Sequence, residues 1–246
     1  MKNKMQKKGK LIVLDGIDGS GKGTQTGFLV DRLKTEGFPV ETISFPSHGE
    51  DSAILVDQYL NGLFGLPTQC DPKLVSGFYA IDRFLKKPRI EKWLAQGTNV
   101  IADRYTSANM GHQGAKIKEE RLREQMFDWI MQLEYGILRL PIPDLNLFIE
   151  MKPEIAYGLI EKKDRRAYTG DKHRDGHEGD LNHLIAAHNS FAHVARICDS
   201  NVNIDQRLIY RPYNWKVIEC DDGKKPLPLE FIHELVWEAV EKCLEK

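Results

Sequence analysis

Between Lys10 and Gln25 the chain reads KLIVLDGIDGSGKGTQ. The apolar run 11–14 predicts a buried strand, and the glycines that follow lead to Lys22 at the start of a predicted helix. This is a G-x-x-x-x-G-K loop, whose backbone N–H groups surround a phosphate chain beside the positive end of the helix dipole. Lys22 supplies a point charge for the β/γ-phosphates of a nucleotide. The residues predicted to bind that nucleotide are Gly16, Ile17, Asp18, Gly19, Ser20, Gly21, Lys22, Gly23 and Thr24.

Gly23 departs from the usual form of this loop, in which Ser or Thr follows the lysine. The hydroxyl that would bind Mg²⁺ directly is therefore missing. Thr24 comes one residue later and can still reach a phosphate. We infer that Mg²⁺ is held more through water and carboxylates than by the loop itself.

Composition and charge exclude several classes of protein. The chain has 246 residues, of which 41% are hydrophobic and 29% charged, as in an ordinary globular protein. A formal net charge of −1 gives no basic field that would favour nucleic acid. No apolar run approaches the roughly 18 residues of a membrane span. The four cysteines are far apart in the sequence, which fits a reduced cytoplasmic compartment.

The expected organisation is one large domain with a short tail. Residues 1–10 contain five lysines and no apolar core of a secretory signal, so we interpret residues 1–9 as a basic disordered tail. Residues 10–246 show no internal repeat and no linker, and are expected to form a single domain.

Strand and helix patterns alternate along the chain. Strands are predicted at residues 11–14, 40–45, 99–102, 145–150 and 215–219. Helices are predicted from the loop to about residue 36, at 51–60, from 72 to about 96 with Pro88 as a candidate break, from 118 to about 138, from 153 to about 163, at 181–197 and at 229–244. This alternation predicts an α/β fold with a parallel five-stranded sheet covered by helices on both faces.

Ligands of such sheets bind beyond the carboxyl ends of the strands, where Asp103 and Arg104 are expected. Asp103 would orient Mg²⁺ or its waters, or alternatively cap a helix. The guanidinium of Arg104 suits a phosphate. Asp18 is unusual inside a phosphate loop, and we interpret it as a contact to Mg²⁺ or a sugar hydroxyl; the alternative is a surface turn residue.

Residues 161–180 are rich in charge and glycine and have no periodicity. They would form either a solvated loop or a mobile lid that closes over the phosphates, delivers cations and excludes water, and we favour the lid. Its cations are Lys162, Lys163, Arg165, Arg166, Lys172 and Arg174.

Taken together, these motifs resemble the thymidylate kinases of the P-loop nucleoside monophosphate kinases, from residue 10 to about residue 195. The loop resembles the family's G-x-D-G-x-G-K-x-T-Q, although Gly23 is more like adenylate kinases. The FPSHG stretch at 45–49 resembles the segment beside the monophosphate, with His48 where the family commonly has Arg or Tyr. The YAIDR stretch at 79–83 resembles the segment that binds thymine, which implies stacking by Tyr79 and a base contact from Arg83.

The most specific match is the run 103–114, which begins DRYTS and ends GHQG. It implies that Arg104 holds the monophosphate and that Gln113 lies by the base, with His112 in place of the usual Tyr. The HEGD stretch at 177–180 resembles the end of the family's lid. Gly19 offers no arginine in the loop, so the resemblance implies catalytic cations from the lid, and the candidates are Lys163, Arg166 and Arg174.

The resemblance implies an ATP:dTMP phosphotransferase that uses Mg²⁺ and makes dTDP for dTTP synthesis, in a family where homodimers are usual. It implies no essential general base, because the acceptor phosphate is already an anion. Implied metal contacts are Asp18 and Asp103, and implied catalytic residues are Lys22, Arg104 and the three lid cations. The implied substrate-binding residues are Asp18, Phe45, Pro46, His48, Tyr79, Arg83, Arg104, His112 and Gln113.

Two other functions remain open from the sequence. Another nucleoside monophosphate kinase, of the UMP, CMP or AMP type, is favoured by Gly23 and by the changed residues His48 and His112. A non-catalytic nucleotide-binding protein would bind ATP and transfer no phosphate to any monophosphate.

Overall fold

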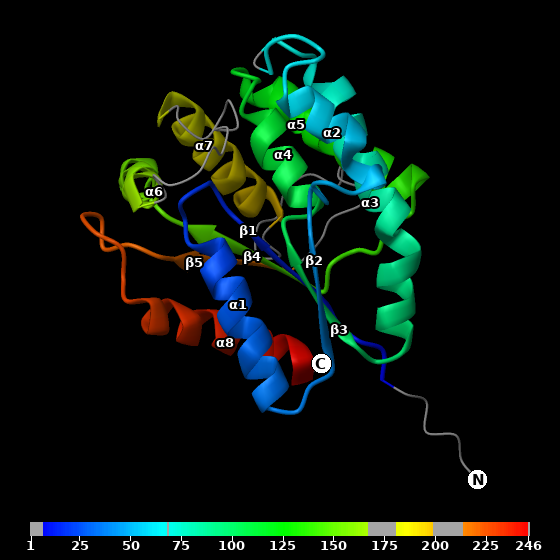
Figure 1. Cartoon of the computed structure of the whole chain (residues 1–246), viewed down its shortest axis with the longest axis vertical. Helices are drawn as coiled ribbons and strands as arrows, with labels where there is room; N and C mark the ends of the chain where they lie inside the picture. Colours follow the sequence, from blue (N-terminus) through cyan, green and yellow to red (C-terminus); the bar gives the residue numbers. More distant parts are fainter. Residues whose placement is uncertain (1–6, 68, 167–180, 199–213, 246) are drawn as a thin grey trace.

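A parallel five-stranded sheet of order β2-β3-β1-β4-β5 forms the centre of the protein (Figure 1). The computed structural model describes residues 7–67, 69–166, 181–198 and 214–245. The predicted α/β fold and all five predicted strands are confirmed. The strands are β1 (Leu11–Asp15), β2 (Val40–Ser44), β3 (Asn99–Asp103), β4 (Leu145–Glu150) and β5 (Trp215–Glu219).

Helices cover both faces of this sheet (Figure 1). In the described part of the chain they are α1 (Lys22–Thr35), α2 (Ile54–Leu60) after a 3₁₀ turn at Asp51–Ala53, α3 (Pro72–Ala95), α4 (Thr106–Gly114), α5 (Glu120–Met131), the π-helical turn η2 (Gln132–Ile137), α6 (Pro153–Arg166), α7 (Leu181–Cys198) and α8 (Leu229–Glu245). None of the described helices has the length and apolarity needed to cross a membrane.

The central strand β1 is buried on both sides, which explains its continuous apolar sequence. Successive side chains of a strand point to opposite faces. Leu11 and Val13 accordingly pack in one core with α3, α4 and α5, whereas Ile12 and Leu14 pack in a second core with α1 and α8. The strand therefore anchors the phosphate loop between two helical layers.

Pro88 lies inside α3 and does not interrupt it, so the candidate break at this position is absent. Proline removes the hydrogen bond to the carbonyl group four residues earlier, which here belongs to Phe84. Both Pro88 and Phe84 are exposed, so water can hydrate the carbonyl group that the proline leaves unpaired. The predicted start of this helix is confirmed: Asp71 caps it, accepting hydrogen bonds from the backbone N–H groups of Lys73 and Leu74.

Helix α4 is the one described helix that the sequence did not indicate. Its residues, TSANMGHQG, include two glycines and several polar side chains of low helix propensity. Packing against α7 stabilises it instead. A Cβ atom on Gly111 would lie 2.4 Å from the ring of Phe191, so only glycine permits this close approach. The position of α4 matters because it follows Arg104 directly and presents side chains to the cavity described below.

Candidate active site

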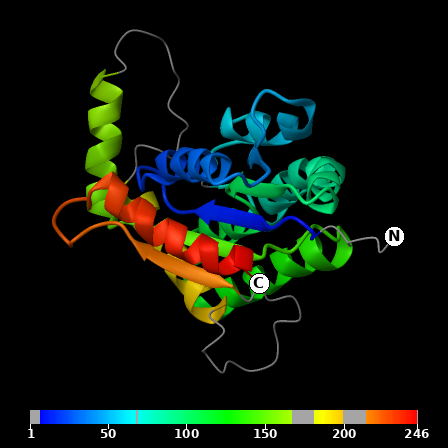
Figure 2. The same ribbon diagram turned by 90° about the horizontal axis from the view of Figure 1, so that it is seen from below.

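The phosphate loop, from Gly16 to Lys22, connects β1 to α1 and packs against α6. Figure 2 shows α6, in yellow-green, projecting from the body of the molecule. Gly19 has a φ of 79°, and a Cβ atom there would lie 2.4 Å from the carbonyl oxygen of Ala156 in α6. No side chain fits at this position. The sequence already shows that the loop has no arginine at this position. The contact with α6 gives the structural reason for that absence.

Asp18 forms ion pairs with two cations of the site. Its Oδ1 atom lies 3.2 Å from Nζ of Lys22 and also accepts a hydrogen bond from Nη2 of Arg104. Burial alone would raise the pKa of Asp18, but Arg104 and Lys22 outweigh it and hold that pKa far below its usual range. Asp18 is therefore a charged member of the site rather than a surface turn residue.

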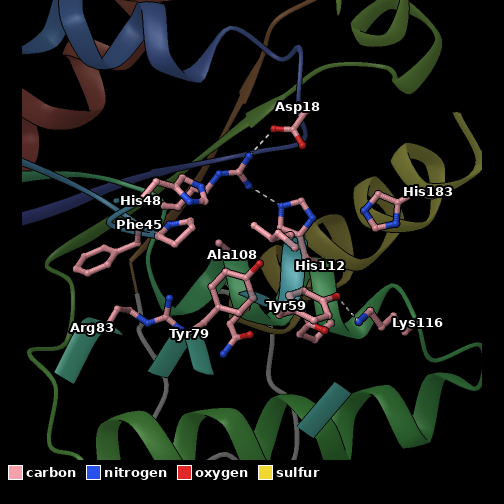
Figure 3. Close-up of a pocket in the computed structure, with 15 residues that line it drawn as sticks. Asp18, Phe45, His48, Tyr59, Tyr79, Arg83, Ala108, His112, Lys116 and His183 are labelled. Atoms are coloured by element: carbon pink, nitrogen blue, oxygen red, sulfur yellow. Dashed lines mark hydrogen bonds and ion pairs between the residues drawn. The ribbon is translucent and has the colours of Figure 1, made fainter. Parts of the chain in front are cut away.

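Arg104 stands at the end of β3 in a left-handed backbone conformation, with a φ of 66°. Its Nη1 atom lies 2.6 Å from Nε2 of His112; the dashed lines that reach Asp18 and His112 in Figure 3 mark the two contacts of this guanidinium. Because arginine only donates, Nε2 of His112 accepts and the neutral ring carries its proton on Nδ1. Burial, reinforced by Arg104, lowers the pKa of His112 well below its usual value. His112 thus positions Arg104 without adding charge.

Two carboxylates beside the loop have an unpaired oxygen. Within the described residues, Oδ1 of Asp103 and Oδ1 of Asp15 are buried and have no hydrogen-bond partner. Burial raises the pKa of Asp15 to about 7, although the hydroxyl of Ser107 donates to its other oxygen. Asp103 does not cap α4, because Tyr105 occupies the cap position and no side chain bonds there. Buried carboxylate oxygens without partners fit a hydrated divalent cation.

Asp103 also lies close to the position of the missing loop hydroxyl. A Cβ atom on Gly23 would be 4.0 Å from Oδ2 of Asp103, an ordinary van der Waals distance. Carboxylate oxygen therefore faces the place where the usual loop hydroxyl would bind Mg²⁺. This arrangement agrees with the inference that carboxylates and water replace the loop hydroxyl.

A cavity of about 170 Å³ opens beside Asp18 and Arg104 (Figure 3). The structure brings all nine predicted substrate-binding residues to its wall. They are Asp18, Phe45, Pro46, His48, Tyr79, Arg83, Arg104, His112 and Gln113.

The two ends of the cavity differ in chemistry. In Figure 3, Arg83 and Tyr79 lie across the cavity from Asp18. Arg83 is only 1% exposed and forms a bidentate pair with Glu134, with N–O distances of 2.7 and 2.6 Å. Burial opposes the charge of Arg83, but Glu134 more than compensates and raises the pKa of the guanidinium. One end therefore carries Arg104 paired with Asp18 of the phosphate loop, and the other carries a neutralised guanidinium beside an aromatic ring.

The segment 45–49 is held in place by two aspartates. Oδ2 of Asp82 accepts a hydrogen bond of 2.8 Å from the backbone N–H of Ser47. Oδ1 of Asp57 contacts Nδ1 of the His48 ring. Oδ2 of Asp57 accepts a hydrogen bond of 3.1 Å from the backbone N–H of Gly49. These contacts fix the cavity wall that His48 contributes.

Six wall residues were missed by the sequence analysis: Tyr59, Leu60, Ala108, Asn109, Lys116 and His183. Lys116 donates hydrogen bonds to the hydroxyl of Tyr59 and the carbonyl of Pro67, at 3.0 and 2.9 Å, and burial lowers its pKa to about 8. Asn109 lies three residues before His112, and Lys116 lies three residues after Gln113. This is the spacing of one helical face, and it would have identified Asn109 and Lys116 had a helix been expected here.

The lid candidates fall at the edge of the described chain. The backbone of Lys163 and Arg166 belongs to the last turns of α6. Arg174 and the rest of residues 167–180 lie outside the described residues, as do residues 1–6 of the predicted tail.

Known proteins resemble this chain in sequence and in fold. A family model described as thymidylate kinase matches residues 14–193. The human protein named thymidylate kinase is 26% identical over 244 residues, which cover 98% of this chain and 95% of the human protein. Its Caenorhabditis elegans namesake is 32% identical over 160 residues, covering 61% of this chain and 67% of that protein. A solved structure of thymidylate kinase from Candida albicans has a similar fold, with a TM-score of 0.65 at 21% identity over 96% of this chain and 92% of that one.

Proposed function

The chain belongs to the thymidylate kinase family, and we propose from this membership that it transfers the γ-phosphate of ATP to dTMP. The observation that carries the proposal is a cavity that extends from Asp18 of the phosphate loop and Arg104 at one side to Tyr79 and Arg83 at the other. In this assignment the loop residues 16–24 bind ATP, Arg104 and His48 face the 5′-phosphate of dTMP, and the aromatic ring stacks on thymine.

The reaction needs positioning and charge neutralisation more than covalent chemistry. An oxygen of the dTMP phosphate attacks the γ-phosphorus in line, and the bond from that phosphorus to the β–γ bridging oxygen breaks, leaving ADP. No general base is required, because the attacking phosphate is already an anion. Lys22 neutralises charge on the β/γ-phosphates while Arg104 holds the acceptor. We assign the remaining positive charge to the lid cations Lys163, Arg166 and Arg174.

The residues beside the loop fit Mg²⁺. Asp103 would hold it, directly or through water, with Oδ1 as the unpaired acceptor. Asp18 would contribute through Oδ2, because Lys22 and Arg104 both contact Oδ1. Held by these two carboxylates, Mg²⁺ would supply positive charge that offsets the negative charge of the nucleotide phosphates.

A panel of acceptors tests this function. In a coupled assay of ADP release, dTMP is expected to give a higher kcat/KM than dUMP, UMP, CMP or AMP, and activity should disappear with EDTA and return with MgCl₂. Preference for a ribonucleotide would show that the protein is another nucleoside monophosphate kinase. ATP binding without transfer to any acceptor would show a non-catalytic nucleotide-binding protein.

A homodimer is a second part of the proposal. Large apolar side chains on α3 are exposed at near-heptad spacing: Leu74, Ile81, Phe84 and Leu85 are 55%, 43%, 43% and 56% exposed. Such a stripe favours pairing of two helices. We place the enzyme in the cytoplasm, because its four cysteines are far apart in the sequence and form no C-x-x-C pair.

Light scattering after size exclusion is expected to give about twice the chain mass of 28.2 kDa. Ile81→Glu should yield the monomer, because the new charge would lie in the α3 contact. Ile142→Glu places the same charge at an isoleucine that is 49% exposed elsewhere, and it should leave the dimer intact. A dimeric Ile81→Glu variant would rule out α3 as the interface.

A further inference from the structure

Glu134 is a fully buried carboxylate behind the base end of the cavity. It lies in the π-helical turn η2, where the wider turn departs from the spacing of α5. Four donors converge on it. Nε and Nη2 of Arg83 lie at 2.7 and 2.6 Å, Oγ1 of Thr106 at 2.7 Å and Nδ2 of Asn109 at 3.0 Å. A buried charge with this set of partners organises several groups at once.

The contact with Asn109 fixes the orientation of an amide. Nδ2 of Asn109 donates to Glu134 and, at 3.1 Å, to the backbone carbonyl of Ser76. Both partners can only accept, so the amide cannot turn round without losing both hydrogen bonds. The oxygen, Oδ1, is consequently the atom left over. It is buried, it has no hydrogen-bond partner among the described residues, and Asn109 lines the cavity.

Glu134 also determines which nitrogen atoms of Arg83 remain available to a ligand. Nε and Nη2 are engaged with Glu134, which leaves Nη1 outside the pair. Glu134 also neutralises the guanidinium, so this end of the cavity is a poor site for a second phosphate. Because both residues line the cavity, we expect a base bound there to meet Nη1 of Arg83 as a hydrogen-bond donor and Oδ1 of Asn109 as an acceptor.

We propose that Glu134 is a positioning residue for base selectivity: by fixing Asn109 and Arg83 it makes the cavity accept a base with a carbonyl next to a ring N–H. Thymine and uracil have this pattern at O4 and N3–H. Cytosine has the reverse pattern, an amino group next to an unprotonated N3, and would leave both side chains facing like groups. The inference rests on the proposed dTMP kinase function and names what selects its base.

The test compares dTMP with dCMP in wild-type protein and in Glu134→Gln. In the variant, the new NH₂ group faces an N–H donor whichever way it turns, so at least one of the contacts that fix Asn109 and Arg83 is lost. The ratio of kcat/KM for dTMP to kcat/KM for dCMP is expected to fall by about 10- to 100-fold. Most of the change should appear in KM for dTMP, because the base is remote from the reacting phosphate. KM for ATP should not change.

Two further variants separate positioning from general stability. Glu134→Asp keeps the buried charge but cannot reach all four donors, so it should fold and still lower the ratio. Leu133→Ala shortens a half-buried apolar side chain of the same turn and should leave the ratio unchanged. Ratios within about twofold of wild type in both Glu134 variants would overturn the inference, even if activity on the two acceptors fell in parallel. Absence of dTMP transfer in wild-type protein would instead refute the proposed function.

Discussion

Replacing Lys22 by alanine is expected to lower kcat by about 10²- to 10³-fold, the cost of removing one preorganised charge from a transition state. The Nζ atom of Lys22 lies within reach of the loop carbonyl of Ile17 and of Asp18, at the N-terminus of α1, where we propose that the nucleotide phosphates bind. The fold should persist. Asp18 keeps its ion pair with Arg104 when Lys22 is absent, so no buried carboxylate is left without a cation.

The measurement is single-turnover transfer from ATP to dTMP, together with thermal unfolding by circular dichroism. Lys34→Ala is the matched control, because Lys34 is an exposed residue in the last turn of the same helix. The control should retain wild-type transfer and stability. A wild-type rate in Lys22→Ala would contradict the assignment of the loop lysine.

Arg104→Ala is expected to lower kcat/KM for dTMP by about 10²- to 10³-fold, because the acceptor phosphate loses its fixed guanidinium. Arg104→Lys should recover only part of this loss, since a point charge cannot reproduce the two-pronged contact. The neighbouring His112 should not compensate, because it is neutral and accepts a hydrogen bond from the missing group. Steady-state kinetics with dTMP as the varied substrate measure these effects.

The backbone of Arg104 allows activity to be separated from strain. A φ of 66° is unfavourable for any side chain with a Cβ atom, so Arg104→Gly should be about 1 kcal/mol more stable than Arg104→Ala and equally impaired in activity. Arg139 provides the control, because it also has a positive φ, 53°, and is exposed outside the cavity. Arg139→Ala should retain wild-type kinetics. Normal kcat/KM in Arg104→Ala would remove Arg104 from the acceptor site.

The parts of the fold that could be predicted are those with a local physical signature. The apolar run of β1 and the glycines before Lys22 each constrain the backbone by themselves, and strand alternation then determines the sheet. Helix α4 has no such signature. Its glycines oppose helix formation, and packing against distant parts of the chain, such as the contact of Gly111 with Phe191, explains why it is helical.

The residues of the candidate site also divide into those that local sequence predicts and those that it does not. Arg104 and Asp18 stand next to recognisable motifs, so their types and positions were informative. Glu134 looked like one more charged residue in an amphipathic helix, and charged residues are rarely buried. Its burial follows from Arg83, 51 residues away, and from the π-helical turn that directs it inward. Neither a partner at that separation nor an irregular turn can be read from local sequence.

The ion pairs of Asp18 with Lys22 and Arg104 have a consequence for which anions the site admits. In this arrangement the protein supplies one carboxylate to both cations, so one of their two positive charges is already offset before any ligand arrives. An isolated sulfate or inorganic phosphate would compete with this internal carboxylate, and it would gain less net attraction than from two unpaired cations. A nucleotide has additional contacts, through its base, its sugar and a bound metal ion, that offset the competition with this carboxylate. We therefore expect the site to bind small anions weakly in comparison with its nucleotide substrates.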